Sequence, residues 1–198
     1  MHYISDILYW ISTGLLVPVI VLLIMLFARA LLLIGSFFGQ YLSVRQTEAL
    51  LKQEFDVLDK DSVVTLAERL PKGQKTLVVS YMHRMLKHKE SEAHLQKLLA
   101  DFDIAAASNL ATSKTLAKMG PMLGLMGTLI PMGPALVGLS TGDIASMAYN
   151  MQVAFATTVV GLFSAAIGFI TGQVKTRWYK RDCVNLQFLA DLLTEKQK

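Results

Sequence analysis

Positive charge is confined to two blocks of this 198-residue sequence. Thirteen of its nineteen Lys and Arg residues lie between Arg29 and Lys118, and the other six follow from Lys175 to the end. The segments 1–28 and 119–174 contain no Lys or Arg and hold the most apolar runs. Apolar segments with cations on one side only are typical of helices that cross a bilayer with their cationic side in the cytoplasm. The sequence therefore predicts an oriented membrane protein.

Composition agrees with this interpretation. Hydrophobic residues make up 53% of the chain and charged residues 17%, whereas soluble domains average about 25% charged residues. The formal charge of +4 is explained by topology, and no nucleic-acid-binding motif accompanies it.

The one cysteine, Cys183, cannot form a disulfide within the chain. The N-terminus lacks the basic segment of a cleavable signal peptide. No nucleophile–base pair, phosphate-binding loop or metal-ligand spacing is present, so we do not expect an enzyme.

Three apolar stretches are long enough to span a bilayer, which requires about 20 helical residues. These stretches are 7–27, 119–139 and 147–170. Arg29 marks the cytoplasmic end of the first, and the cation-free turn at 140–143 is expected outside. The N-terminus is therefore predicted outside and the C-terminus inside. Residues 30–38 are too short to span and are predicted to extend the first helix among partner helices.

The predicted fold class is an all-α integral membrane protein with a helical cytoplasmic domain. The predicted parts are 1–39 (first span and extension), 40–118 (cytoplasmic domain), 119–172 (second and third spans) and 173–198 (C-terminal amphipathic helix). Apolar residues recur at helical spacing from Leu77 to Phe102, and from Tyr179 to Leu193 in steps of 4, 3, 4 and 3. Asp61 is expected to cap a short helix that ends at Leu70.

Small residues follow one face of each of the last two spans. In the second span these are Gly120, Gly124, Thr128, Pro131, Ala135, Gly138 and Gly142, and in the third Ala154, Thr158, Gly161, Ala165, Gly168 and Gly172. Small residues allow close backbone approach, which holds helices together in lipid. Two interpretations remain open: the faces form a packing seam, or they also line a narrow shared cavity.

Hydroxyl groups are the main polar feature of these faces. Thr128 and Thr158 lie within them, Thr157 adjoins the second, and neither span carries a charge. A chain that relayed ions by itself would normally place an ionisable group inside the membrane. We therefore expect any titrating group to come from another chain.

Two motifs carry a resemblance to a known family. Residues 120–128 read GPMLGLMGT and residues 154–167 read AFATTVVGLFSAAI. These segments resemble the second-span and third-span signatures of the MotA/TolQ/ExbB proton-channel family, and the three-span order resembles its TolQ and ExbB branch.

The resemblance implies a homopentamer around the single spans of a dimeric partner of the MotB/TolR/ExbD kind. In that family a partner aspartate binds H⁺ or Na⁺, and ion flow is converted into mechanical work. Thr128 and Thr158 match the pore-facing hydroxyls that meet the aspartate, and Thr157 is a secondary candidate. No bound cofactor is implied.

The sequence departs from the family pattern at two places in the third span. Gly168 stands where many members have proline, and Val153, beside Gln152, stands where some have glutamate.

The predicted helix-packing residues are Gly120, Gly124, Gly127, Pro131, Gly138, Ala154, Gly161, Ala165 and Gly168. Arg29 and Trp178 are predicted at the membrane boundary. The alternative function is a non-conducting oligomeric membrane scaffold that docks cytoplasmic factors.

Overall fold

The described part of the chain is helical. The computed structural model describes residues 2–55, 76–87 and 91–195, and no strand occurs among them. The helices are α1 (His2–Gly14), α2 (Leu16–Phe55), α4 (Leu77–Lys87), α5 (Glu92–Thr141) and α6 (Ile144–Glu195). The short helix expected between Asp61 and Leu70 lies outside the described residues.

Three of the helical segments are long and apolar enough to cross a membrane: Ile7–Glu48, Glu92–Thr141 and Ile144–Glu195. These segments contain the three stretches that the sequence predicted as spans. Continuous helix is expected there, because every backbone N–H and C=O must be satisfied within the segment in lipid. The structure thus supports a multi-pass membrane protein.

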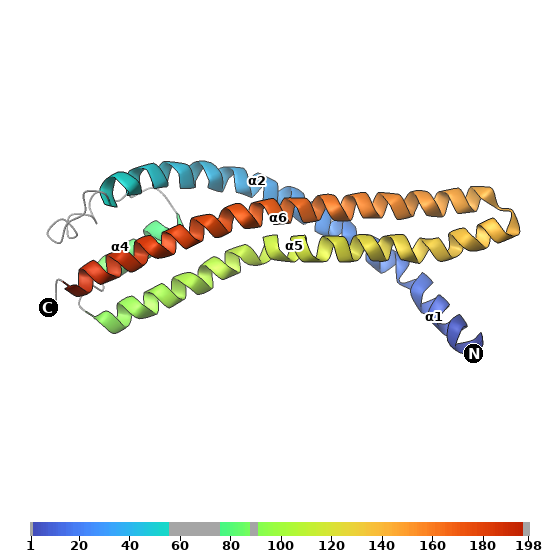
Figure 1. The fold of residues 1–198 in the computed structure, drawn as a ribbon, viewed down its shortest axis with the longest axis horizontal. Coiled ribbons are helices and arrows are strands. Elements are labelled where there is room, and N and C mark those ends of the chain that lie inside the picture. Colours follow the sequence, from blue (N-terminus) through green and yellow to red (C-terminus); the bar gives the residue numbers. More distant parts are fainter. Residues whose placement is uncertain (1, 56–75, 88–90, 196–198) are drawn as a thin grey trace. The chain divides into compact units, whose positions relative to one another are not determined.

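The first predicted span lies within one of these segments, but it contains a break that was not predicted from the sequence. α1 ends at Gly14, Leu15 forms a turn, and α2 begins at Leu16. Pro18 has no N–H to donate to the carbonyl of Gly14, and glycine is itself a poor helix former. Together these two residues explain why the helix changes direction here (Figure 1).

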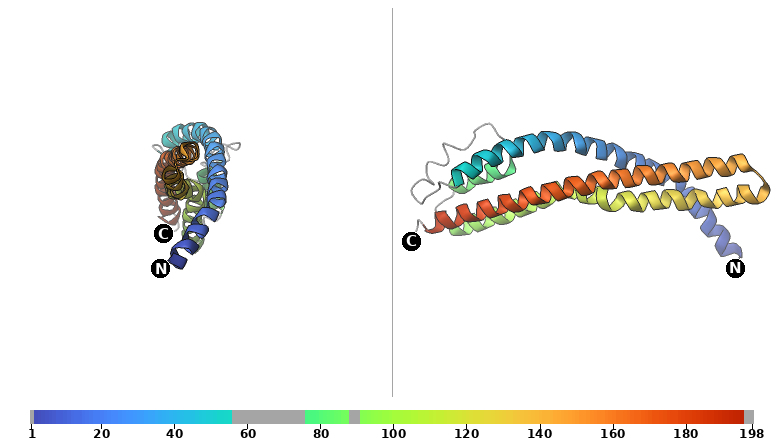
Figure 2. Two further views of the ribbon diagram at one scale, coloured as in Figure 1. Left: turned by 90° about the vertical axis from the view of Figure 1, so that its right-hand side faces the viewer. Right: turned by 45° about the horizontal axis from the view of Figure 1, so that its top comes forward.

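The chain divides into two compact units, which are described separately. The first unit comprises 1–35 and 112–172, and the second comprises 36–111 and 173–198. Within the first unit, α5 and α6 run side by side in opposite directions (Figure 2). Gly142 makes the tight turn between them with a φ of 77°, a conformation that glycine adopts at little cost. The Asp143 carboxylate then caps α6 by accepting a hydrogen bond from the Ser146 N–H at 3.0 Å.

α2 packs against one side of this hairpin. Val19 and Leu23 form a buried cluster with Leu123 and Ile130 of α5, and Val160 of α6 packs against it. Further along α2 lies a second buried cluster, made of Ala30, Leu33, Leu116 and Ile167. The extension after residue 29 was predicted to lie among partner helices. Ala30 and Leu33 pack on the hairpin of their own chain, because the apolar stripe of α2 continues past Arg29. Contact of this extension with partner helices stays a prediction.

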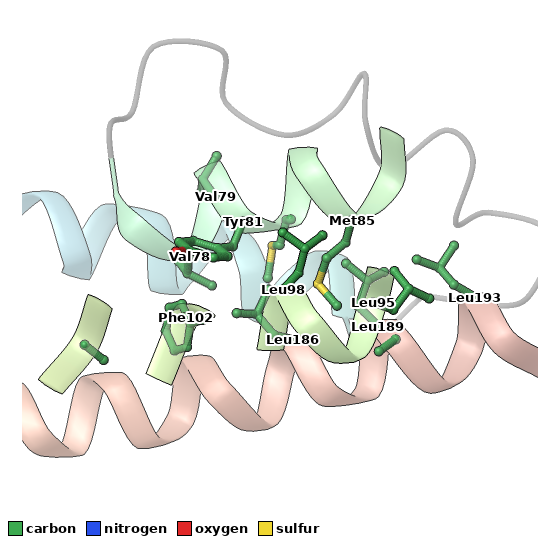
Figure 3. Close-up of a cluster of buried hydrophobic side chains, with 13 residues drawn as sticks. Val78, Val79, Tyr81, Met85, Leu95, Leu98, Phe102, Leu186, Leu189 and Leu193 are labelled. Atoms are coloured by element: carbon green, nitrogen blue, oxygen red, sulfur yellow. The ribbon is translucent and has the colours of Figure 1, made fainter. Parts of the chain in front are cut away.

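A larger core fills the second unit. Its buried side chains come from α4, α5 and α6 and include Met82, Met85, Leu95, Phe102, Leu186 and Leu189, none more than 1% exposed. Figure 3 shows labelled members of this core from all three helices converging on one another. The predicted stripe of α6 is confirmed: Leu186, Ala190 and Leu193 are buried, with Tyr179 and Cys183 packed beside them.

Aromatic rings connect α2 and α6 within the second unit. The Trp178 indole stacks on Phe37 with ring centroids 5.5 Å apart and planes 9° from parallel. Trp178 also contacts Tyr41, over whose ring the Arg45 guanidinium lies. Trp178 thus has a packing role inside the chain, and its placement at the membrane boundary stays a prediction.

A charged cluster lies near this aromatic contact. Arg181 of α6 donates a hydrogen bond to the Glu48 carboxylate of α2. The side chains are 41% and 40% exposed, so this ion pair adds little stability. Asp182 follows in the sequence. Burial raises the pKa of its carboxyl from 3.8 to about 6, nearby Arg181 opposes that rise, and Glu48 adds to it.

Replacing Asp182 by Asn should stabilise the protein at neutral pH. Because the folded state holds the Asp182 proton to higher pH than the unfolded state, stability falls as pH rises from 3.8 to about 6 and stays lower above that value. Asp182→Asn should therefore raise the thermal midpoint, followed by circular dichroism in detergent, far more at about pH 8 than at about pH 4. Asp191→Asn, at an exposed site of the same helix, is the matched control. An equal effect of Asp182→Asn at both pH values would contradict this account.

Candidate functional site

Glycine holds the backbones of α5 and α6 in close contact within the first unit. A Cβ atom built on Gly161 would lie 2.7 Å from the Gly120 carbonyl oxygen and 2.9 Å from the Gly124 Cα. A Cβ atom on Gly120 would meet the Gly161 carbonyl oxygen at 2.6 Å and the Ala165 Cβ at 2.9 Å. Real Cβ atoms do not approach other atoms so closely, and backbone atoms cannot move aside. No residue larger than glycine fits at either position without separating the helices.

The same close contact extends along the hairpin. Gly127 lies against the Thr157 side chain, whose Cβ and Oγ1 would be 2.6 Å from an added Cβ. Near the turn, Gly138 lies against Met147, and at the other end Gly168 lies against Leu116 and Ala117. The remaining predicted packing residues of α5 and α6, Pro131, Ala154 and Ala165, are buried. We call this contact the glycine seam.

The glycine seam includes the residues that immediately precede the two main threonine candidates, Thr128 and Thr158. Gly127, not Thr128, meets α6, and the side chain that contacts it is Thr157, not Thr158. Thr157 is 6% exposed, so in this chain it fills the seam. Thr128 and Thr158 are half-buried at its edge.

Helix geometry places Thr128 and Thr158 on the same side of the hairpin. Successive residues of an α-helix are rotated by about 100°. Gly127 and Thr157 face each other across the seam. Because α5 and α6 are antiparallel, the residues that follow them, Thr128 and Thr158, are rotated toward the same side of the seam. Thr128 then lies opposite residue 156, which places it about 3 Å from the level of Thr158 along the hairpin.

α2 covers the other side. Leu116, Leu123 and Ile130 recur every seven residues on α5 and contact α2. Val160 and Ile167 are the corresponding residues of α6. These side chains are rotated from the seam in the direction opposite to Thr128 and Thr158. The two half-buried threonines therefore lie on the side of the hairpin that α2 leaves uncovered, which we call the hydroxyl face.

Both threonines donate a hydrogen bond to their own helix. The Thr128 hydroxyl donates to the Leu125 carbonyl at 2.7 Å, and the Thr158 hydroxyl donates to the Ala154 carbonyl at 3.1 Å. In this arrangement the hydroxyl proton is engaged, and the oxygen lone pairs remain available as acceptors.

No ionisable side chain accompanies these hydroxyls along the two helices. Between Met119 and Val174 the only Asp, Glu, Lys, Arg or His residue is Asp143, at the turn. The Gln152 side chain is exposed and Val153 is half-buried. The hydroxyl face can accept hydrogen bonds from a polar group, but it has no acid or base of its own.

The family model of the MotA/TolQ/ExbB proton channel family matches residues 69–187. This match covers more than half of the chain and includes both motif segments and the glycine seam. The chain belongs to the MotA/TolQ/ExbB proton channel family. No curated protein and no solved structure matches it. Membership in a channel family agrees with three apolar helices and with a polar but uncharged face, and it does not favour an enzyme.

Sequence reasoning missed one polar contact of this channel-family hairpin. Thr171 and Ser164 are buried in the seam with Thr157 at intervals of seven residues, and the hydroxyl oxygens of Thr171 and Ser113 lie 3.3 Å apart. The spacing of seven was visible in the sequence. Because Ser113 precedes the expected start of the second span, its pairing with Thr171 could not be foreseen.

Replacing Gly161 by Ala should disrupt the hairpin. Its Cβ would collide with backbone atoms of α5, which overpacks the seam and should cost about 1–3 kcal/mol. Thermal unfolding of the purified protein in detergent measures the loss. Gly35→Ala is the matched control because nothing lies within 4 Å of its Cβ, and it should keep or slightly raise the midpoint. A Gly161→Ala variant as stable as the control would show that the seam is looser than described.

Proposed function

We propose that this protein is the ring-forming subunit of an ion-driven membrane motor. In this proposal a homopentamer surrounds the single spans of a dimeric partner, and H⁺ or Na⁺ flow is converted into mechanical work. The observation that carries the proposal is the hydroxyl face, which combines Thr128 and Thr158 on a side of the hairpin that α2 does not cover. Family membership supports the channel part of the proposal.

The titrating acid is proposed to come from the partner. A carboxyl group is costly inside a membrane unless polar groups receive it. Thr128 and Thr158 each offer an acceptor oxygen, and the two residues differ by about 3 Å in level along the hairpin. A protonated carboxyl is a hydrogen-bond donor, whereas a carboxylate is only an acceptor. With both hydroxyl protons held by the backbone, the hydroxyl face favours the protonated acid, which is the form that carries a proton across the apolar region.

The hydroxyl face also determines the proposed assembly. It is flanked by large exposed apolar side chains, among them Leu125, Leu129 and Leu162 at 54–65% exposure. Neighbouring copies would cover these side chains and turn the hydroxyls inward, while α2 lies outside. The cation distribution orients the ring in the cytoplasmic membrane with the N-terminus outside and the C-terminus in the cytoplasm.

The alternative is a non-conducting membrane scaffold. The close packing of the glycine seam favours it, since that seam accounts for the small residues without an ion path. The seam does not account for two hydroxyls on the uncovered side, and we therefore prefer the motor.

Replacing Thr158 by Val should strongly reduce proton flux and leave the ring assembled. Valine keeps the shape of threonine and removes the acceptor oxygen. The measurement is proton uptake by proteoliposomes that contain the complex with its single-span partner, and wild-type rings without that partner should conduct little.

Thr158→Ser retains the hydroxyl and should retain flux. Thr115→Val is the matched control, because Thr115 is exposed on α5 outside the proposed hydroxyl pair. Full proton flux in the Thr158→Val variant would contradict the proposed role of the Thr158 hydroxyl. Equal flux with and without the partner would contradict an acid supplied by another chain.

A further inference from the structure

Two lysines continue the uncovered side of α5 beyond the hydroxyl face. Lys114, Pro121 and Thr128 are spaced by seven residues, which returns to the same face in a supercoiled helix pair. Lys118 begins the adjacent stripe, followed by Leu125 and Met132 at the same spacing. All members of these stripes except Thr128 are exposed. Lys114 therefore shares the stripe of Thr128, and Lys118 is rotated from it by a further fraction of a turn, toward the side of α5 opposite α2. The two lysines lie about 21 and 15 Å from Thr128 along α5.

These lysines face away from α2. The side of α5 that contacts α2 carries Leu116, Leu123 and Ile130. Leu116 lies between the two lysines in sequence and belongs to the same buried cluster as Ala30, so Arg29 of α2 lies at nearly the same level. Cations therefore lie at one level of the first unit in two places: Arg29 is on α2, and the lysine pair is on the side of α5 opposite α2.

In the part of the chain that the structure describes, no acidic side chain pairs with either lysine. No Asp or Glu occurs between residues 104 and 142, and none occurs between 144 and 181. Cations near the cytoplasmic end of a span are expected in general. That rule predicts positively charged side chains at this depth of the membrane. It does not predict that both lysines lie on the face of α5 that α2 leaves free.

For the H⁺-driven form of the proposed motor, we propose that Lys114 and Lys118 form a positively charged collar at the cytoplasmic mouth of the ion path, which keeps K⁺ and Na⁺ of the cytoplasm out. This inference rests on the proposed function, because it requires the hydroxyl face to line that path. Repeated in every copy of a ring, the collar repels hydrated metal cations, and low-dielectric walls strengthen such repulsion. A proton that is carried on a neutral carboxyl reaches the hydroxyl face without a metal ion accompanying it.

The test compares potassium leak with proton uptake in proteoliposomes that hold the complete complex. Lys114→Gln combined with Lys118→Gln should raise potassium leak about tenfold and keep proton uptake. Lys114→Gln alone should raise the potassium leak by a smaller factor. This single variant provides the test if the double variant does not assemble. Lys114→Arg with Lys118→Arg keeps the charge and should keep the low leak.

Arg29→Gln is the matched control, since it removes a cation at the same level but from α2, and it should leave the leak unchanged. Unchanged leak in both glutamine variants, with proton uptake intact, would overturn the collar and leave the motor standing. A wild-type complex that conducts no protons would overturn both proposals, so the two failures are distinguishable.

Discussion

The close approach of α5 and α6 is the constraint on which the rest of the first unit depends. Gly161 lies so near Gly120 and Gly124 that neither helix can rotate or move outward without losing the contact. Because apolar burial does not drive helices together in lipid, van der Waals contact between backbones supplies the attraction. The contact fixes the rotation of both helices, and thereby it decides which side chains fill the seam and which lie beside it.

That fixed rotation separates three kinds of surface on α5. Gly120 and Gly127 meet α6, Leu123 and Ile130 meet α2, and Thr128 lies on the side that neither helix covers. A polar group on a membrane helix satisfies itself by bonding to its own backbone, as Thr128 and Thr158 do. What distinguishes these two residues is their common side and nearly common level. Both properties follow from the seam.

Much of this arrangement could be predicted from the sequence. The three apolar segments, the absence of charge from the last two spans and the apolar stripe from Tyr179 to Leu193 all follow from residue type and spacing. The exact seam could not be predicted. Steps of three and four residues fit Gly127 and Thr128 equally well, and only the Thr157 side chain on the opposite helix selects Gly127.

Two further features depended on tertiary contacts or on local competition. The continuation of α2 past Arg29 is held by Leu116 and Ile167, which lie more than eighty residues away in sequence. The break at Leu15 depends on Gly14 and Pro18 acting together within an apolar run that hydropathy alone describes as continuous. The spacing of apolar residues predicted the helices, but it did not predict which helices pack against one another.

The most direct test of the central claim is an image of the purified complex by electron cryomicroscopy at side-chain resolution. The account predicts a ring of this chain with Thr128 and Thr158 of each copy turned toward central helices from a second protein, and with α2 on the outside. A closed centre without foreign helices, with both threonines facing lipid, would contradict it.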